Sequence, residues 1–458
     1  MLFCSERFFL FFCAVFAVYW AMPWRKARVW WLLAASFTFY ASWNKWLALL
    51  IAASTLADYL IARGLDASPN HALRRLLVSL SIVGNLGLLA YFKYANFFLQ
   101  SVSEALHACG STASLPLLQV FLPIGISFYT FEAINYTVDV YRRKAPAERD
   151  LAHFMLFITF FPHLVAGPIV RARDFLPQIR RPKRWDWNRM HLGARLFVMG
   201  FVKKAVIADR MAAYADFTFA HPESCGRLMA WMGLFAYALQ VYCDFSGYTD
   251  MAIGMAHGLG YKLAPNFDMP FLSANISEFW RRWHISLSTW FRDYVYIPLG
   301  GSRTGRWRTC LNLMVVMALC GLWHGAAWTF VAWGVLQGVL LVGHRGFRAF
   351  CGRLPLLDRL LRTPPGVALR VAVTFTVFCL GLVVFRSTTF AGAACLLDRL
   401  FVPHYYLSFP MQTDAFWVLA AATLVCHGVG RTGLWKALVV RLPAPVLGGG
   451  YAAAMVAA

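Results

Sequence analysis

The sequence predicts an all-α integral membrane protein, a bundle of about ten to thirteen membrane helices that include short or re-entrant elements. Of its 458 residues, 60% are hydrophobic and 14% are charged, whereas soluble domains average about 45–50% apolar and about 25% charged residues. Apolar runs recur from residue 8 onward, and the formal net charge of +22 resides in short basic clusters between them, as expected for loops facing anionic lipid. These observations exclude an ordinary soluble protein and disfavour nucleic-acid binding. They predict one polytopic domain over residues 1–458.

Apolar stretches mark the candidate membrane-spanning or membrane-embedded segments. In chain order they are residues 8–23, 29–43, 46–62, 76–99, 116–140, 152–170, 193–215, 228–243, 311–343, 369–387 and 415–429. Several are shorter than the about 20 residues that a helix needs to cross a bilayer, so tilted or re-entrant elements are expected. The first stretch has no clear small-residue cleavage site before Arg25, so we expect a retained helix rather than a signal peptide.

Basic clusters predict the orientation of the first segments. Lys and Arg residues follow the first, third and fifth segments, at residues 25–28, 63–75 and 142–144, whereas residues 101–115 contain neither. By the positive-inside rule the three clusters face the cytoplasm and residues 101–115 form an outside loop. The amino terminus is then expected outside.

The sixth segment departs from this pattern. If residues 152–170 crossed the membrane, the basic stretch at residues 171–184 would lie outside. Pro162, Gly167 and Pro168 interrupt a helix, so we predict a re-entrant element shielded by protein or by a water-filled cavity. His163 lies within it and could line that cavity, although a local backbone cap is the simpler interpretation.

Residues 262–310 combine arginines with tryptophans and tyrosines. This mixture is too polar for lipid contact and too aromatic for a solvated loop, so the segment should lie at the membrane interface or line an internal cavity. Helical spacing would place Trp280, His284 and Ser288 on one face.

Arg281, Arg282 and Arg292 would add positive charge near that face. They could hold the phosphates of an acyl carrier or stabilise negative charge during acyl transfer. The alternative is an interfacial helix whose arginines meet lipid head groups and whose aromatic residues anchor it.

His324 ends the apolar run from Leu311 to Trp323 and is followed by another apolar run. Ionisable groups within a membrane protein are functional-site hypotheses by default. A desolvated imidazole stays neutral and can accept the proton of a hydroxyl group during acyl transfer. The alternative is a helix-end histidine that bonds to a backbone carbonyl.

Asp244 follows an apolar segment in the string Y-C-D-F-S-G-Y-T-D, one turn from Tyr248. Because a buried carboxylate requires a partner, Asp244 and Asp250 could pair with the arginines of residues 281–292, orient a histidine or bind a cation. A structural ion pair is the favoured interpretation. No hydrolase, zinc-protease or phosphate-loop motif is present, and no metal site is expected.

Four passages resemble a known family. They are Leu122–Glu132, Phe161–Pro168, Asp244–Asp250 and the tryptophan-rich string Phe279–Gly301, which is followed by L-W-H-G at residues 322–325. With these passages the chain resembles the membrane-bound O-acyltransferase family, in the branch of alginate O-acetyltransferase and the D-alanine-transferring proteins of Gram-positive walls. The motif-rich core covers residues 116–345. The alginate branch often has Gln where His163 stands, so no role is transferred to His163.

The resemblance implies helices around a central funnel, with His324 as the general base at a catalytic constriction. His284 matches the second motif histidine and would position substrate or assist protonation. The residues expected to bind substrate are Trp280, Arg281, Arg282, Trp283, Ser288, Trp323, Asp244 and Tyr248.

The resemblance also implies the substrates and partners. An acyl donor, acetyl-CoA by expectation, approaches from the cytoplasmic side, and a hydroxyl acceptor arrives from the opposite side of a bacterial inner membrane. No permanently bound cofactor is expected. The partners are the lipid bilayer and a periplasmic accessory acetyltransferase protein that passes acetyl groups onward to a polysaccharide.

The leading hypothesis is therefore an O-acetyltransferase for an exported, alginate-like polysaccharide. Within enzymes, the alternative is transfer of D-alanine or another acyl unit from a carrier to a lipid or protein hydroxyl. From another class, the chain could be a transporter of an acylated molecule that uses its histidines as a proton relay. A purely structural scaffold would not need polar motifs concentrated between residues 244 and 324.

Overall fold

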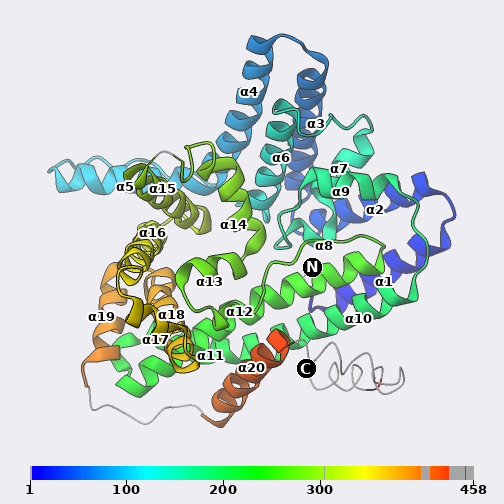
Figure 1. Cartoon of the computed structure of the whole chain (residues 1–458). Coiled ribbons are helices and arrows are strands. Elements are labelled where there is room, and N and C mark those ends of the chain that lie inside the picture. Colours follow the sequence, from blue (N-terminus) through cyan, green and yellow to red (C-terminus); the bar gives the residue numbers. More distant parts are fainter. Residues whose placement is uncertain (1–2, 304, 404–412, 433–448, 450–458) are drawn as a thin grey trace. The chain divides into compact units, whose positions relative to one another are not determined.

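The computed structural model describes residues 3–303, 305–403, 413–432 and 449 (Figure 1). Throughout these ranges the secondary structure is helical and contains no β-strand, which confirms the predicted all-α class. The described residues gather into two compact units, one within residues 1–197 and 249–264 and the other within residues 198–248 and 265–458. The single domain over residues 1–458 stays a prediction, because compact units of this kind can be parts of one domain.

Helices make up the first unit. They are α1 (Glu6–Ala21), α2 (Arg25–Ala41), α3 (Lys45–Ala67), α4 (His71–Leu89), α5 (Ala95–Ala108), α6 (Ile126–Tyr141), α7 (Leu151–Thr159), α8 (Phe161–Leu164), α9 (Ala172–Arg180) and most of α10 (Trp187–Val202), with the final turns of α12 (Arg227–Gly258). Helices α3, α4 and α6 pack side by side (Figure 1). The local sequence explains several starts, because the side chains of Ser5, Asn44, Asn70 and Asp150 accept backbone N–H bonds at the beginnings of α1, α3, α4 and α7.

The second unit contains the long and short helices that carry the tryptophan-rich motif. They are α11 (Asp209–Ala220), the first part of α12, α13 (Ile276–Arg282), α14 (Ile285–Phe291), α15 (Arg306–His324), α16 (Trp328–Cys351), α17 (Pro355–Arg362), α18 (Pro364–Arg386), α19 (Phe390–Phe401) and α20 (Asp414–Thr432). Helices α15 and α16 form a tightly packed hairpin, and α16 also packs against α13 and α18.

Six helical stretches of the described chain are long and apolar enough to cross a membrane. They are Lys45–Ala67, His71–Ala108, Arg227–Gly258, Trp328–Cys351, Pro364–Arg386 and Asp414–Thr432. Other predicted segments form shorter helices, such as α1 with 16 residues. The protein is thus a helical, multi-pass membrane protein, while the orientation of its ends and the funnel stay predictions.

Three predicted segments differ from the structure. Residues 101–115 do not form only a loop, because α5 continues to Ala108, shortly before Gly110, which has a φ of 84°. Residues 116–140 contain no helix before Ile126, since Pro116 and Pro123 precede it and Gly125 adopts a left-handed conformation. Residues 311–343 form two helices, because the first one ends at His324.

The predicted re-entrant element is interrupted where the prolines and glycine indicate. Helix α7 has only nine residues, about 13–14 Å of rise, which is less than half the thickness of a bilayer core. Pro162 lies in the first turn of the one-turn helix α8, and a Cβ atom on Gly167 would lie 2.3 Å from the Cα atom of His163. The interruption is therefore confirmed, whereas its return to the same membrane face stays a prediction.

This interrupted element is tied to α6. The Glu132 Oε1 atom accepts a hydrogen bond of 2.8 Å from the Val170 backbone N–H and lies 3.3 Å from Nδ1 of His163. A Cβ atom on Gly125 would lie 2.5 Å from the carbonyl oxygen of Leu164. Two of the four motif passages thus pack against each other, and His163 is fully buried within protein.

Candidate functional site

The tryptophan-rich string does not form one continuous helix. Helix α13 ends at Arg282, Trp283 is extended, and His284 adopts a left-handed conformation with a φ of 41° before α14 begins. The prediction that Trp280, His284 and Ser288 share one helical face is therefore wrong. Because the backbone breaks at His284, the direction of its side chain is not set by a helix shared with Trp280 and Ser288.

Polar side chains outside the string hold this break in place. The Oδ1 atom of Asn266 accepts hydrogen bonds from the backbone N–H of Ser286 at 3.1 Å and from its hydroxyl at 2.7 Å. The Asn266 carbonyl accepts the Ile285 N–H at 2.9 Å. At the start of α13, Asn275 caps the N–H of Glu278. These contacts offset the cost of a left-handed conformation at a residue other than glycine.

Glycines bring α15 and α16 into direct backbone contact. A Cβ atom on Gly321 would lie 2.2 Å from the carbonyl oxygen of Phe330, and one on Gly334 would lie 2.3 Å from that of Met317. Small residues allow such close approach between membrane helices. In the W-H-G string, a Cβ atom on Gly325 would lie 2.1 Å from the Phe330 ring, so a larger residue there would require that ring to move.

His324 is the last residue of α15 and lies among aromatic rings from three helices. Its ring centroid is 5.0 Å from that of Trp323, 5.2 Å from that of Trp333 on α16 and 5.2 Å from that of Phe385 on α18. Each pair meets edge to face, with interplanar angles between 78° and 89°. These three residues, Trp323, Trp333 and Phe385, form an aromatic cage around part of the imidazole, which is half-buried.

The structure brings His284 to the same cage. The His284 ring lies 5.8 Å from the Trp323 ring and 4.6 Å from the ring of Phe245 on α12. His284 is only 1% exposed. Burial, and secondly a positive charge on His324, lower the pKa of His284 well below its ordinary value. The buried imidazole is therefore neutral near pH 7, and the two motif histidines belong to one site.

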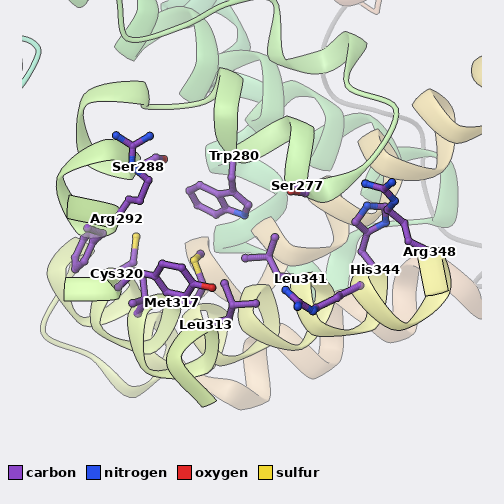
Figure 2. A pocket seen from close by; sticks show the side chains of 14 residues that line it. Ser277, Trp280, Ser288, Arg292, Leu313, Met317, Cys320, Leu341, His344 and Arg348 are labelled. Atoms are coloured by element: carbon purple, nitrogen blue, oxygen red, sulfur yellow. The ribbon is translucent and has the colours of Figure 1, made fainter. Parts of the chain in front are cut away.

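A cavity of about 410 Å³ adjoins this cage. Figure 2 shows the Trp280 indole at its centre, with Arg292 at one end and His344 and Arg348 at the other. Two links join the cavity to His324. The Trp280 ring lies 5.9 Å from the Trp333 ring of the cage, and the cavity-lining Cys320 is one helical turn before His324 on α15. One aromatic layer thus separates the cavity from the histidine.

The other residues predicted to bind substrate have different surroundings. Ser288 lines the cavity, whereas Trp283 is buried against Phe279 and Phe378. Arg282 pairs with Glu278 at 3.0 Å, and Arg281 is exposed within electrostatic range of His344. The prediction that residues 262–310 line a cavity is therefore confirmed for part of that segment.

Asp244 does not pair with these arginines. Its Oδ1 atom lies 2.5 Å from Nζ of Lys204, which also contacts Asp209 at 2.8 Å. The prediction of an arginine partner is wrong, because Lys204, which lies on a π-helical turn, occupies the position beside the carboxylate. The favoured structural ion pair is confirmed, and Tyr248 lies on the same helix, α12.

Sequence reasoning missed several residues of the site. Asn266 and Glu278 belong to no recognisable motif. The only feature of the sequence that could indicate their role is that polar residues often flank a helix break. Gln337, Arg345 and Arg348 lie on one face of α16. They lie 4, 12 and 15 residues after Trp333, a helical spacing that could have found them only once Trp333 was known to contact His324.

The chain is similar in sequence to proteins that are named as acyl-transferring enzymes. The probable alginate O-acetylase of Pseudomonas aeruginosa is 40% identical over 405 residues, which cover 88% of this chain and 75% of that protein. The peptidoglycan O-acetyltransferase of Helicobacter pylori is 39% identical over 344 residues, 69% of this chain and 64% of that protein. The teichoic acid D-alanyltransferase of Bacillus subtilis is 29% identical over 282 residues, 58% of this chain and 69% of that protein.

The family model for membrane-bound O-acyltransferases matches residues 8–385, which include all four motif passages and both motif histidines. That range also includes α18, which contributes Phe385 to the aromatic cage. The chain is therefore an O-acyltransferase that acts at a lipid bilayer on an acyl donor, and it belongs to the membrane-bound O-acyltransferase family.

Proposed function

We propose that this enzyme transfers acetyl groups from acetyl-CoA across the bacterial inner membrane, for O-acetylation of an exported, alginate-like polysaccharide. The names of its relatives support acetyl as the transferred group, since those at about 40% identity are named for O-acetylation of alginate or peptidoglycan. The observation that carries the proposal is the aromatic cage, which places His324 and a neutral His284 beside a cavity with a cationic lining.

His324 acts as the general base in this mechanism. Its imidazole accepts the proton of the acceptor hydroxyl while the hydroxyl oxygen attacks the thioester carbonyl carbon. The carbon–sulfur bond then breaks, and the imidazolium returns the proton to the departing thiolate, so CoA leaves as a thiol and the acceptor leaves as an acetyl ester. The edge-on rings of Trp333 and Phe385 keep the imidazole oriented and exclude water that would hydrolyse the thioester.

His284 has a positioning role beside His324. It is buried and neutral, and it meets Trp323 edge to face. It orients the cage and avoids placing a second positive charge next to the imidazolium that forms on His324.

A periplasmic accessory protein accepts the acetyl group and passes it to the polysaccharide. Acetyl transfer from one membrane face to an acceptor on the other moves the acyl group without moving CoA. The alternative donor is an acyl unit on a carrier protein, which the relative named teichoic acid D-alanyltransferase supports.

Purified enzyme in detergent, given radiolabelled acetyl-CoA and an alcohol acceptor, tests the proposal. Replacing His324 with Ala or Gln should reduce acetyl transfer at least a hundredfold, in line with the about 10²–10⁴-fold contribution of general-base catalysis. His71→Ala, at an exposed histidine of α4, is the matched control and should retain full activity. Both proteins should show the wild-type melting temperature within a few degrees.

Three outcomes count against the proposal. Normal turnover in the His324 variants would remove the catalytic assignment. Turnover with a D-alanyl carrier protein but not with acetyl-CoA would favour the alternative donor. A requirement for an ion gradient, with no release of free CoA in detergent, would indicate a transporter.

A further inference from the structure

One face of α16 runs from the aromatic cage to the cationic end of the cavity. Trp333, Gln337, Leu341, His344 and Arg348 follow one another at spacings of three or four residues, so they share a face of the helix. From Trp333 to Arg348 this face extends about 22 Å at about 1.5 Å per residue. Its length is comparable to that of an extended pantetheine arm with the pyrophosphate attached.

The far end of this face is cationic. Arg345, Arg348 and His344 line the cavity together with Arg292, and none of the residues that line it is acidic. Arg345 and Arg348 are exposed, and no carboxylate lies within ion-pair distance of either guanidinium among the residues described in the structure. Arg292 differs, because its Nε atom contacts Asp293 at 2.8 Å. Figure 2 places His344 and Arg348 together, on the side of the cavity away from Arg292.

Between the aromatic cage and the cationic end of the cavity lie buried polar atoms that have no hydrogen-bond partner in the described part of the chain. The Nε1 atom of Trp280, which lines the cavity, is buried without a hydrogen-bond acceptor in the described part of the chain. The same holds for Nε1 of Trp333 and for both amide atoms of Gln337, whose side chain is fully buried. A Cβ atom on Gly381 would lie 2.9 Å from the Gln337 nitrogen and 3.7 Å from the Trp333 nitrogen, so both point at the same stretch of α18.

Buried donors and acceptors without partners are costly, so each calls for an explanation, and a bound molecule that completes it is one. A largely apolar cavity with a buried indole N–H that lacks an acceptor suits the pantetheine arm, which carries two amide groups. Exposed guanidinium groups without carboxylate partners suit phosphates, which they bind through charge-assisted hydrogen bonds.

We propose that Arg345 and Arg348 bind the phosphates of the 3′-phospho-ADP part of coenzyme A, while Trp280 binds its pantetheine arm. The enzyme then selects a free nucleotide thioester as donor and discriminates against pantetheine held on a carrier protein. This inference rests on the proposed function, because it extends the donor site of the same reaction. The phosphates of lipid head groups have the same chemistry, so the test separates the two sources.

Calorimetric binding to the enzyme in detergent compares free CoA, dephospho-CoA, which lacks the 3′-phosphate, and pantetheine, which lacks the nucleotide. Wild-type enzyme should bind CoA about tenfold more tightly than dephospho-CoA, equivalent to one charge-assisted hydrogen bond. The double variant Arg345→Ala, Arg348→Ala should lose this preference and bind CoA at least tenfold more weakly. Its affinity for pantetheine should stay within twofold of wild type.

Arg359→Ala is the matched control, since Arg359 is an exposed arginine on α17 outside the cavity lining, and it should bind all three probes like wild type. Kinetics give a second measurement. The double variant should raise KM for acetyl-CoA with kcat nearly unchanged, and should leave kcat/KM for S-acetyl-pantetheine unchanged.

Unchanged CoA affinity in the double variant would overturn the inference and leave lipid phosphates as the partners of these arginines. Equal loss of CoA and pantetheine would also overturn it, because the arginines would then support the fold rather than the nucleotide. Failure of the proposed function is distinguishable, because it appears as His324-independent transfer or as no acetyl transfer while these binding differences persist.

Discussion

The rings of His284 and Trp323 meet edge to face with their centroids 5.8 Å apart. Trp323 in turn lies 5.0 Å from His324, so one indole contacts both motif histidines. The two histidines come from separate motif passages, yet a charge on His324 influences His284. A change to either ring is therefore felt by the other, through packing and through charge.

The first prediction concerns pH. Burial lowers the pKa of His284 well below its ordinary value, about 6.5 in an unfolded chain. Between the two values the unfolded chain binds more protons, so the free energy of unfolding decreases as the pH falls below about 6.5. His284→Asn removes this contribution. Melting temperatures between about pH 7 and pH 5 should thus decrease more steeply for wild type than for the variant.

The comparison of slopes removes the contribution of the other histidines, which both proteins share. Parallel curves for the two proteins would show that His284 titrates normally in the folded state, and would contradict its assignment as a buried, neutral ring.

The second prediction concerns the glycine of W-H-G. Gly325→Ala would place a Cβ atom 2.1 Å from the Phe330 ring, so that ring must move and disturb its edge-to-face contact with Phe385 of the aromatic cage. We expect at least a tenfold loss of acyl transfer and a destabilisation of about 1–3 kcal/mol, the usual cost of overpacking. Enzyme assays and thermal unfolding measure the two effects.

Gly343 on α16 is the control, because a Cβ atom there meets nothing within 4 Å. Gly343→Ala should retain activity and gain about 0.5–1 kcal/mol through helix propensity. If both variants behave alike, close packing at Gly325 is not what orients His324.

The third prediction concerns the buried carboxyl group of α6. Glu132→Ala leaves the Val170 N–H without its acceptor, at a cost of about 1–3 kcal/mol for an unsatisfied buried donor. Glu132→Gln keeps an acceptor oxygen and should cost less. Thermal unfolding in detergent should rank the proteins wild type, Gln variant and Ala variant.

Glu104→Ala tests the specificity of that effect, because Glu104 is exposed on α5 and accepts a hydrogen bond from Gln100, also on α5. Its melting temperature should equal that of wild type. An Ala variant at 132 as stable as this control would mean that the interrupted element folds without its tie to α6.

The fourth prediction concerns the ion pair of Asp244. Both partners are partly exposed, and Lys204 keeps its contact with Asp209 when Asp244 is lost. Asp244→Asn should therefore destabilise the protein by less than about 1 kcal/mol, and less again in high salt. Steady-state kinetics should show KM for acetyl-CoA within twofold of wild type. A tenfold rise in KM would instead support the substrate contact that the sequence suggested for Asp244.

The sequence predicts the fold class well for a physical reason. A bilayer core contains no water, so membrane-embedded segments must be apolar and must satisfy their backbone hydrogen bonds within helices. The sequence also predicts the break at Pro162 and Gly167. Proline lacks the backbone N–H that a helix needs, and glycine, which lacks a Cβ atom, disfavours helix through its backbone entropy. The start of α6 at Ile126 was missed because a long apolar run does not show where a left-handed glycine delays the helix.

The sequence predicts the two histidines of the site but not the residues that surround them. His324 stands out because an ionisable residue between apolar runs needs a reason. Trp333, Phe385 and Gln337 carry no such signal, since aromatic and amide residues on a membrane helix usually belong to its packing. Helical periodicity failed at His284, because the hydrogen bonds of Asn266 to Ser286 stabilise a break that no local pattern reveals.

The left-handed backbone at His284 has a consequence for anyone who mutates this position exhaustively. In a library of all replacements at this position, the ability of each residue to adopt the left-handed conformation would decide which variants fold, before any effect of the imidazole on catalysis is measured. Gly and Asn variants would reach the membrane intact, whereas Val and Ile variants would be degraded for steric reasons alone. Loss of turnover in the β-branched clones would then reveal nothing about proton transfer, and the Asn clone is the fair comparison.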